Sequence, residues 1–270
     1  MCIAPLTIKV PCDVLSGGLT VFEHMQVPCG KCYQCRSARA RQWQFRMQIE
    51  AEHAVRSYFI TLTYSDYYLP KDLSLHKEDV QKFFKRFRKY YKEKIKYFAC
   101  GEYGDQFGRP HYHCIIYFYR DFHISFLDYL LGKSWTLGNY VIGTCTNESI
   151  GYVTKYMVKQ WKKDWRTKPF QLMSKRPFIG SDFITPEKEI YYNTPEVLPL
   201  YKDFYNNDVA LPRIYKLKMI CADKAVELKS VYKDLMRKRK MLLQEMTPMD
   251  FEYFHWRNAI KETETKTRKK

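Results

Sequence analysis

Two histidines separated by one residue, His111 and His113, are the feature that most constrains this chain. An apolar run over residues 114–117 follows them, and this pattern is typical of a β-strand. Residues i and i+2 of a strand face the same side of a sheet, so both imidazoles are expected to point to one place. Convergent imidazoles suit a divalent metal ion. The alternative is a structural pair, because this spacing also occurs by chance.

Glu102 precedes the histidine strand, at the end of another predicted strand. If the two strands form a β-hairpin, Glu102 lies near His111 and His113. Two imidazoles and one carboxylate make a mixed nitrogen and oxygen site with open positions, which suits Mg²⁺ or Mn²⁺ held jointly with a phosphate. The alternative is a surface glutamate in a turn.

Tyr152 and Tyr156 lie four residues apart in a predicted helix, so both phenols are expected on one helical face. Lys155 and Lys159 follow each tyrosine by three residues. A phenol has a pKa of about 10 and is a poor nucleophile near neutral pH. A nearby metal or lysine, with in-line placement against a phosphate, can make it competent. The alternative is two packing residues with polar tips.

A dense cysteine cluster, Cys29, Cys32 and Cys35, lies near the N-terminus, and Cys2 and Cys12 upstream could supply a fourth ligand. Thiolates at this spacing favour tetrahedral Zn²⁺ in a structural site. The spacing also matches some iron–sulfur motifs, or three free thiols at the start of a helix.

The charge of the chain indicates a polyanionic partner. There are 46 Lys and Arg against 29 Asp and Glu, a net charge of +17, and aromatic residues make up 17% of the chain. Phosphates attract the charge and bases stack on the rings, so nucleic acid is favoured. A membrane partner is not expected, because no apolar run approaches the roughly 20 residues that a span needs. Without signal-peptide features at the start, the nine cysteines are expected to be reduced thiols in a cytoplasm.

Apolar periodicity predicts an ordered series of elements. In chain order these are a basic helix over 33–56, a strand over 58–64, a helix capped by Ser74 and running to about 94, a strand over 95–101, a loop over 102–110, a strand over 111–119, a helix over 125–133, a strand over 140–144, and a helix from 147 to about 161. This order predicts an α+β fold with a ferredoxin-like (split β-α-β) antiparallel sheet. Helices are expected on one face of the sheet, which leaves the other face free for ligands.

The flanking regions carry weaker patterns. Residues 1–30 and 163–213 are expected to be irregular, residues 214–244 to be basic and helical, and residues 261–270 to be a charged, frayed tail. The predicted domains are therefore a cysteine-containing N-terminal segment with the basic helix (1–57), a core (58–162), and an irregular and helical basic extension (163–270). The basic helix is expected to contact a phosphate backbone or to be a solvated face; its candidate residues are Arg36, Arg39, Arg41, Trp43 and Arg46.

Several segments in fixed order resemble the replication initiation proteins of microviruses, particularly the gokushovirus-like group, within the HUH endonuclease superfamily. The matching segments are 28–36 with Arg39, Trp43 and Arg46, then 59–64, 100–104, 109–113, 152–156, 173–177 and 211–215. The chain departs from the group at Phe178, where the group has glycine, and its last 50 or so residues match nothing in that group.

The resemblance implies a rolling-circle replication initiator. Metal held by His111, His113 and Glu102 positions the scissile phosphate of a single-stranded viral origin, and Tyr156 or Tyr152 attacks it. The products are a 5′-phosphotyrosine and a free 3′-OH that primes the host polymerase, assisted by the host helicase. The second tyrosine then allows strand transfer to close the circle. The implied setting is the cytoplasm of a bacterial host cell.

Other classes of function stay open at this point. One is a non-catalytic module that binds single-stranded nucleic acid through sheet aromatics. A transposase or relaxase of the same superfamily is a near neighbour, and a zinc-dependent hydrolase built on the histidines and cysteines is a third possibility.

Overall fold

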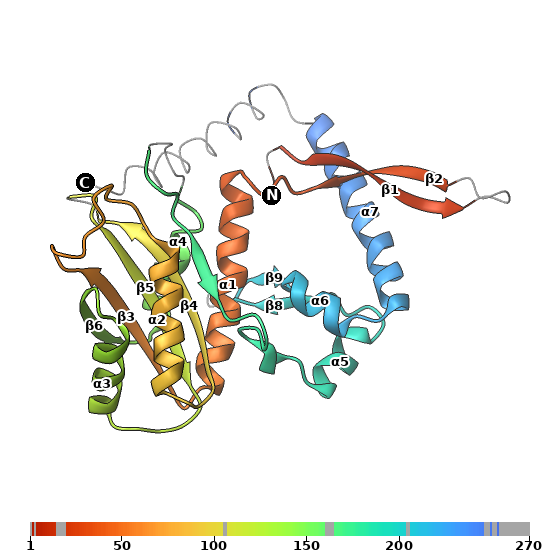
Figure 1. The fold of residues 1–270 in the computed structure, drawn as a ribbon. Coiled ribbons are helices and arrows are strands. Elements are labelled where there is room, and N and C mark those ends of the chain that lie inside the picture. Colours follow the sequence, from red (N-terminus) through yellow and green to blue (C-terminus); the bar gives the residue numbers. More distant parts are fainter. Residues whose placement is uncertain are drawn as a thin grey trace.

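A five-stranded antiparallel sheet organises the chain in this computed structural model (Figure 1). The structure describes residues 2, 4–14, 20–104, 107–159, 165–203, 206–245, 249 and 253. The strands lie in the order β6-β3-β5-β4-β7. Their bounds are β3 Arg56–Tyr64, β4 Ile95–Tyr103, β5 Pro110–Phe118, β6 Gly138–Thr144 and β7 Gln171–Met173. The predicted α+β class and the predicted order of elements in the core are therefore confirmed.

The central strand β5 sends alternate side chains to two different apolar layers. Tyr112, Cys114, Ile116 and Phe118 pack with α2 (Lys77–Tyr90) and α3 (Ile124–Ser134). Ile115 and Tyr117 face the other layer, with α1 (Tyr33–His53) and α4 (Asn147–Lys155). Because both faces are covered, β5 is buried at nearly every position.

The expectation of a sheet face free of helices is wrong. α1 lies against β4, where the ring of Trp43 is 5.4 Å from that of Phe98, and the hydroxyl of Tyr117 donates to the carbonyl of Met47. α1 carries apolar residues on this side, including Met47, which is fully buried. The ligand-bearing end of the sheet is thus framed by helices and is not an open platform.

Three local expectations also need correction. Ser74 does not cap α2; its hydroxyl accepts from the backbone N–H of Thr167, and His76 is the N-cap residue. α4 is capped by Thr146, which forms a capping box with Ser149, and it ends at Lys155, well short of 161. Residues 160–164 lie outside the described residues.

The N-terminal region is a β-hairpin and not irregular as expected. β1 (Leu6–Val14) pairs with β2 (Thr20–Val27), with a register shift after Pro11 that absorbs the proline. Figure 1 shows this hairpin away from the main sheet and crossed by α7. Glu23 of the hairpin forms ion pairs with Lys229 and Lys233 of α7.

The extension after residue 163 holds more regular structure than expected. Its elements are β7, η1 (Ser181–Phe183), α5 (Pro186–Asn193), β8 (Leu200–Lys202), β9 (Asp208–Ala210), α6 (Arg213–Met219) and α7 (Ala222–Glu245). β7 joins the main sheet, and the segments after it share an apolar cluster around Tyr215 and Leu211 that packs on Phe45 of α1. The predicted helical region over 214–244 is confirmed, with a break between α6 and α7. The predicted frayed tail, 261–270, lies outside the described residues.

No helix within the described ranges is long and apolar enough to cross a membrane.

Candidate active site

The two histidines lie side by side on the face of the sheet that α1 and α4 cover. In the register of the sheet, His111 pairs with Glu102 of β4, and His113 lies between Cys100 of β4 and Thr61 of β3. Glu102 belongs to the strand itself and not to the loop in which it was expected. Cross-strand neighbours have Cβ atoms about 5 Å apart, so this register brings the carboxylate and both imidazoles together.

The side chains of Glu102, His111 and His113 converge on one point. His113 Nε2 is 3.3 Å from Glu102 Oε2, and His111 Nε2 is 3.8 Å from Glu102 Oε1. One ligand atom from each of the three residues lies within 4.8 Å of the others. Glu102 is 5% exposed and His113 is 6% exposed. Two nitrogens and a carboxylate oxygen form a donor set for a divalent ion that keeps open positions.

Hydrogen bonds to the outer ring nitrogens orient both histidines. The Nδ1 of His111 is 3.1 Å from the carbonyl oxygen of Arg109, and a carbonyl only accepts, so this nitrogen carries the proton. The Nδ1 of His113 is hydrogen-bonded to Thr61 Oγ1 at 3.0 Å. The Nε2 of His113 is buried and, among the described residues, makes no hydrogen bond, although it lies close to Glu102. Both rings therefore present Nε2 to the centre of the site, as metal-ligating histidines do.

Tyr152 and Tyr156 lie over the histidines. The ring of Tyr152 is 5.1 Å from that of His113, and its hydroxyl donates to Glu102 Oε2 at 3.4 Å. Tyr156 is the C-cap residue of α4 and keeps a helical backbone, so its ring stacks on His113 at 6.3 Å and lies 5.3 Å from Tyr152. Tyr152 is 40% exposed, so this side of the site is open to a large ligand.

The charges at the site favour an ionised carboxylate and neutral phenols. Burial raises the pKa of Tyr156 above its ordinary value, and a hydrogen bond to Glu102 adds to the shift. Burial is also the main cause of the raised pKa of Tyr152. For Glu102, burial alone would raise the pKa, but contacts with His113 and Tyr156 outweigh it and hold the pKa below its usual value. A carboxylate that binds a cation no longer holds the phenol protons in this way.

The two lysines predicted with the tyrosines differ in position. Lys159 Nζ lies 5.5 Å from the centre of the Tyr156 ring, in a turn that follows α4. Lys155 is exposed in the last turn of α4. The structure therefore brings Lys159 to a tyrosine and leaves Lys155 at the surface.

The arginines of α1 divide into two kinds. Arg39 and Arg41 are exposed, as a phosphate-contacting face requires. Arg46 instead stacks on Trp43 at 3.9 Å and donates to the carbonyl of Ile179, so its role is packing. Arg36 donates from Nε to the carbonyl of Val158, just beyond Tyr156.

The cysteine cluster forms a second group of potential ligands. Cys29, Cys32 and Cys35 come together at the start of α1, and Cys2 joins them. Cys12, the other candidate for a fourth ligand, lies in β1.

One functional contact escapes sequence reasoning. Thr61 lies in a strand that pairs with β5 across 52 residues of sequence, so no local pattern places it beside His113. Only the sheet register, once the strand order is known, identifies it.

Comparison with known proteins places this geometry among viral replication proteins. Residues 57–161, which contain Glu102, both histidines and both tyrosines, match the family model of the replication-associated protein ORF2. The chain is 32% identical over 197 residues to "Replication-associated protein ORF2" of Spiroplasma virus 4, covering 64% of this chain and 61% of that protein. No solved structure matches significantly.

Two further relatives carry similar names. The chain is 28% identical over 251 residues to "Replication-associated protein VP4" of Bdellovibrio phage phiMH2K, covering 81% of this chain and 78% of that protein. It is 29% identical over 154 residues to "Replication-associated protein ORF4" of Chlamydia phage 1, covering 50% of this chain and 38% of that protein. The chain thus spans 61%, 78% and 38% of these three proteins. The resemblance to microvirus replication proteins is confirmed.

Proposed function

From the similarity of this chain to replication-associated proteins of three bacterial viruses, we propose that it initiates viral DNA replication by nicking a single strand. The strand order β6-β3-β5-β4 supports the ferredoxin-like arrangement expected of an HUH endonuclease. The net charge of +17 supports a nucleic acid as substrate. The expected substrate is single-stranded DNA at the viral origin, in the cytoplasm of a bacterial host cell.

The observation that carries the proposal is the joint placement of a metal-binding triad and two phenols. Glu102, His111 and His113 converge within 4.8 Å, and Tyr152 and Tyr156 stand over His113. A Mg²⁺ or Mn²⁺ ion held by the triad polarises a phosphoryl oxygen and spreads the charge that develops on the phosphate. The phenols are thus within reach of a phosphate bound beside the triad.

The proposed step is a transfer of the phosphoryl group to tyrosine. The phenolic oxygen of Tyr156 or Tyr152 forms a bond to phosphorus, and the bond from phosphorus to the 3′ oxygen breaks. The released oxygen takes up a proton and becomes the 3′-OH, while the 5′ end stays on the tyrosine. Lys159, beside the Tyr156 ring, stabilises the phenolate that forms. Lys155, exposed on α4, is available to contact the DNA backbone.

Two tyrosines on one helical face permit a second transfer. After the host polymerase and helicase have extended the 3′-OH around the circle, the free tyrosine cuts the regenerated origin. The new 3′-OH then attacks the first phosphotyrosine and closes the circle. Because the phosphotyrosine keeps the energy of the original bond, the joining step needs no ATP.

A covalent-adduct assay tests the proposal. The protein is incubated with a labelled origin oligonucleotide and Mg²⁺ or Mn²⁺, then denatured and resolved by size. We expect a labelled adduct that digestion maps to Tyr156 or Tyr152, and that is absent from the Tyr152→Phe, Tyr156→Phe double variant. Tyr129→Phe, which changes a half-exposed tyrosine of α3, is the matched control and should form the adduct normally.

The same assay separates the other classes of function. Tight binding without cleavage, for authentic origin sequences with either metal, would identify a non-catalytic single-strand-binding module. Cleavage without a covalent adduct would indicate a metal-dependent hydrolase. A transposase or relaxase would form the adduct on an end or transfer-origin sequence in preference to the viral origin.

A further inference from the structure

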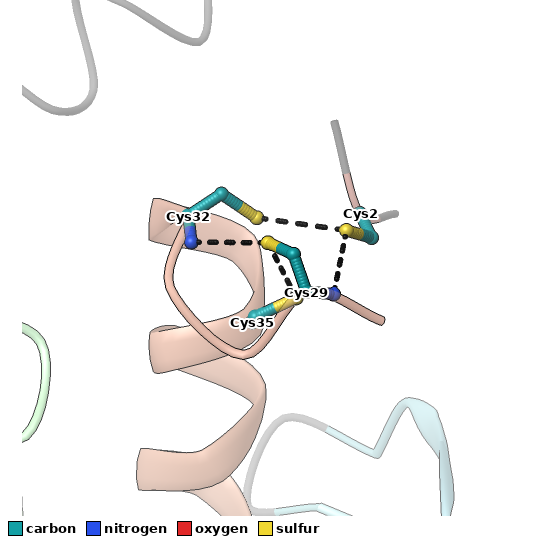
Figure 2. A group of neighbouring side chains, drawn as sticks. All are labelled: Cys2, Cys29, Cys32 and Cys35. Carbon is teal, nitrogen blue, oxygen red and sulfur yellow. Dashed lines mark hydrogen bonds between the residues drawn. The ribbon is translucent and has the colours of Figure 1, made fainter. Parts of the chain in front are cut away.

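Four cysteine sulfurs gather where the N-terminal hairpin meets α1 (Figure 2). The Sγ atoms of Cys29 and Cys35 are 4.0 Å apart, and those of Cys32 and Cys2 are 3.9 Å apart. All four Sγ atoms lie within 4.8 Å of one another, although Cys2 precedes Cys29 by 27 residues. All four are free thiols. The chain therefore returns to one point from two distant segments.

The spacing of the sulfurs fits a single tetrahedral ion. Zinc binds thiolates at about 2.3 Å, which puts the corners of the tetrahedron about 3.8 Å apart. The distances of 3.9 and 4.0 Å are close to that edge length. A disulfide needs about 2.05 Å between sulfurs. An iron–sulfur cluster needs ligands that reach several irons with sulfides between them, which calls for a wider ring of sulfurs.

The backbone around the cluster favours thiolates. The N–H of Cys29 donates to Cys2 Sγ at 3.3 Å, and the N–H of Cys32 donates to Cys29 Sγ at 3.4 Å. Cys32 is the N-cap residue of α1, and Cys35 lies in its first turn, where the helix dipole favours negative charge. No side-chain oxygen caps this helix start, so the cluster stands where a capping group would be expected.

We propose that Cys2, Cys29, Cys32 and Cys35 bind one Zn²⁺ ion in a closed structural site. Four protein ligands leave no open position, so the site does no chemistry on a substrate. The ion joins the start of the N-terminal hairpin to its end and to the first turn of α1, and thereby closes the hairpin into a loop. This inference is independent of the nicking activity, since it concerns metal content alone.

The site also lies one residue from a link to the tyrosines. Arg36 follows Cys35 and donates from Nε to the carbonyl of Val158, two residues after Tyr156, at 2.8 Å. A second guanidinium nitrogen donates to the carbonyl of Lys31, inside the cysteine loop. A metal that fixes the cysteine loop thus also fixes the anchor of the turn that follows α4.

Metal analysis of the purified full chain, carrying its affinity tag at the C-terminus, is the test. We expect one zinc ion per chain by mass spectrometry of the elements, and its loss in Cys2→Ser and in Cys35→Ser. Cys221→Ser changes an exposed cysteine at the start of α7 and should keep the zinc. The double variant His111→Ala, His113→Ala should keep it as well, which separates this ion from one bound at the triad.

Cobalt gives a second measurement that does not depend on the cysteine variants folding. Apo-protein titrated with Co²⁺ alone should develop the visible bands of tetrahedral cobalt and the ultraviolet thiolate-to-cobalt bands, saturating at one ion per chain. Zinc should then bleach them. Octahedral cobalt spectra, iron in place of zinc, zinc lost only with the histidines, or alkylation that finds two disulfides would each overturn the proposal.

Discussion

The triad and the cysteine cluster reach the same end, three or four ligand atoms within 4.8 Å, by different routes. The triad is built by strand register, since Glu102 pairs with His111 and both belong to regular β-structure. The cysteine cluster is built by chain closure, since Cys2 returns to a loop at the start of a helix. Register fixes nitrogen and oxygen ligands with open positions, whereas closure encircles an ion with sulfur. The first arrangement suits chemistry on a substrate, and the second suits a structural role.

Removal of a triad ligand gives the largest expected effect. His113→Ala should lower the nicking rate by about 100- to 1,000-fold, because several kcal/mol of charge stabilisation are lost with the ion and each 1.4 kcal/mol is tenfold. The measurement is single-turnover adduct formation at saturating Mn²⁺. Zinc content should not change. Cys2→Ser should do the reverse, losing zinc with a smaller loss of rate, and a variant that loses both together would mean that the two sites are not separate.

A buried ion pair joins the two elements that carry the sites, and its loss should be nearly as large an effect. Lys96 of β4 and Glu50 of α1 are both fully buried, with Nζ 2.7 Å from Oε2, and Glu50 also accepts from the N–H of Gly180. Lys96→Met leaves a buried carboxylate without its cation, so the free energy of unfolding should fall by about 3–5 kcal/mol in chemical denaturation. Lys92→Met, at an exposed position nearby, should leave it almost unchanged.

A double variant sharpens this result. Because a neutral pair leaves no unpaired charge, Lys96→Met with Glu50→Gln should cost less than the sum of the two single changes. Additive losses would show that the pair is not coupled, and that the sites are held in place by apolar packing alone.

Local periodicity was enough to predict much of the core. A period of two residues places His111 and His113 on one face, and a period of four places Tyr152 and Tyr156 together. These inferences need only neighbours in the chain. The end of α4 at Lys155 does not disturb the second one, because Tyr156 keeps a helical backbone as the C-cap residue.

The remaining features depend on contacts that no local pattern encodes. The sheet face appears free in a count of helices between strands, but α1 precedes the core and folds back on it through Met47. Cys2 joins a cluster 27 residues away only because β1 and β2 pair. The hairpin itself is obscured by Pro11 and by the two glycines between its strands, which weigh against strands in a local prediction.

The hydroxyl of Thr61 offers a smaller and more specific test of the triad. Thr61→Val removes the hydrogen bond that orients His113 and keeps the shape of the side chain, so the Mn²⁺ concentration for half-maximal nicking should rise about 10- to 100-fold. Thr61→Ser keeps the hydroxyl and should restore the wild-type value. Thr63→Val, two residues along the same strand face, removes a bond to the Asn139 carbonyl and serves as control. Equal shifts in both valine variants would count against an orienting role for Thr61.

Arg36 is where the two regions meet, and its loss should have the smallest effect of the four. Arg36→Ala removes the bond from α1 to the Val158 carbonyl, and a charge-assisted hydrogen bond of about 1.5 kcal/mol corresponds to a roughly tenfold loss of nicking rate. Arg36→Lys keeps the charge but not the two-pronged contact, so it should be nearly as slow while binding the oligonucleotide as tightly as wild type. Arg39→Ala removes an exposed charge from the same helix and should weaken binding with little change in the saturated rate. If Arg36→Lys instead restored the rate in full, Arg36 would act through its charge on DNA, and the cysteine loop would be mechanically separate from the tyrosines.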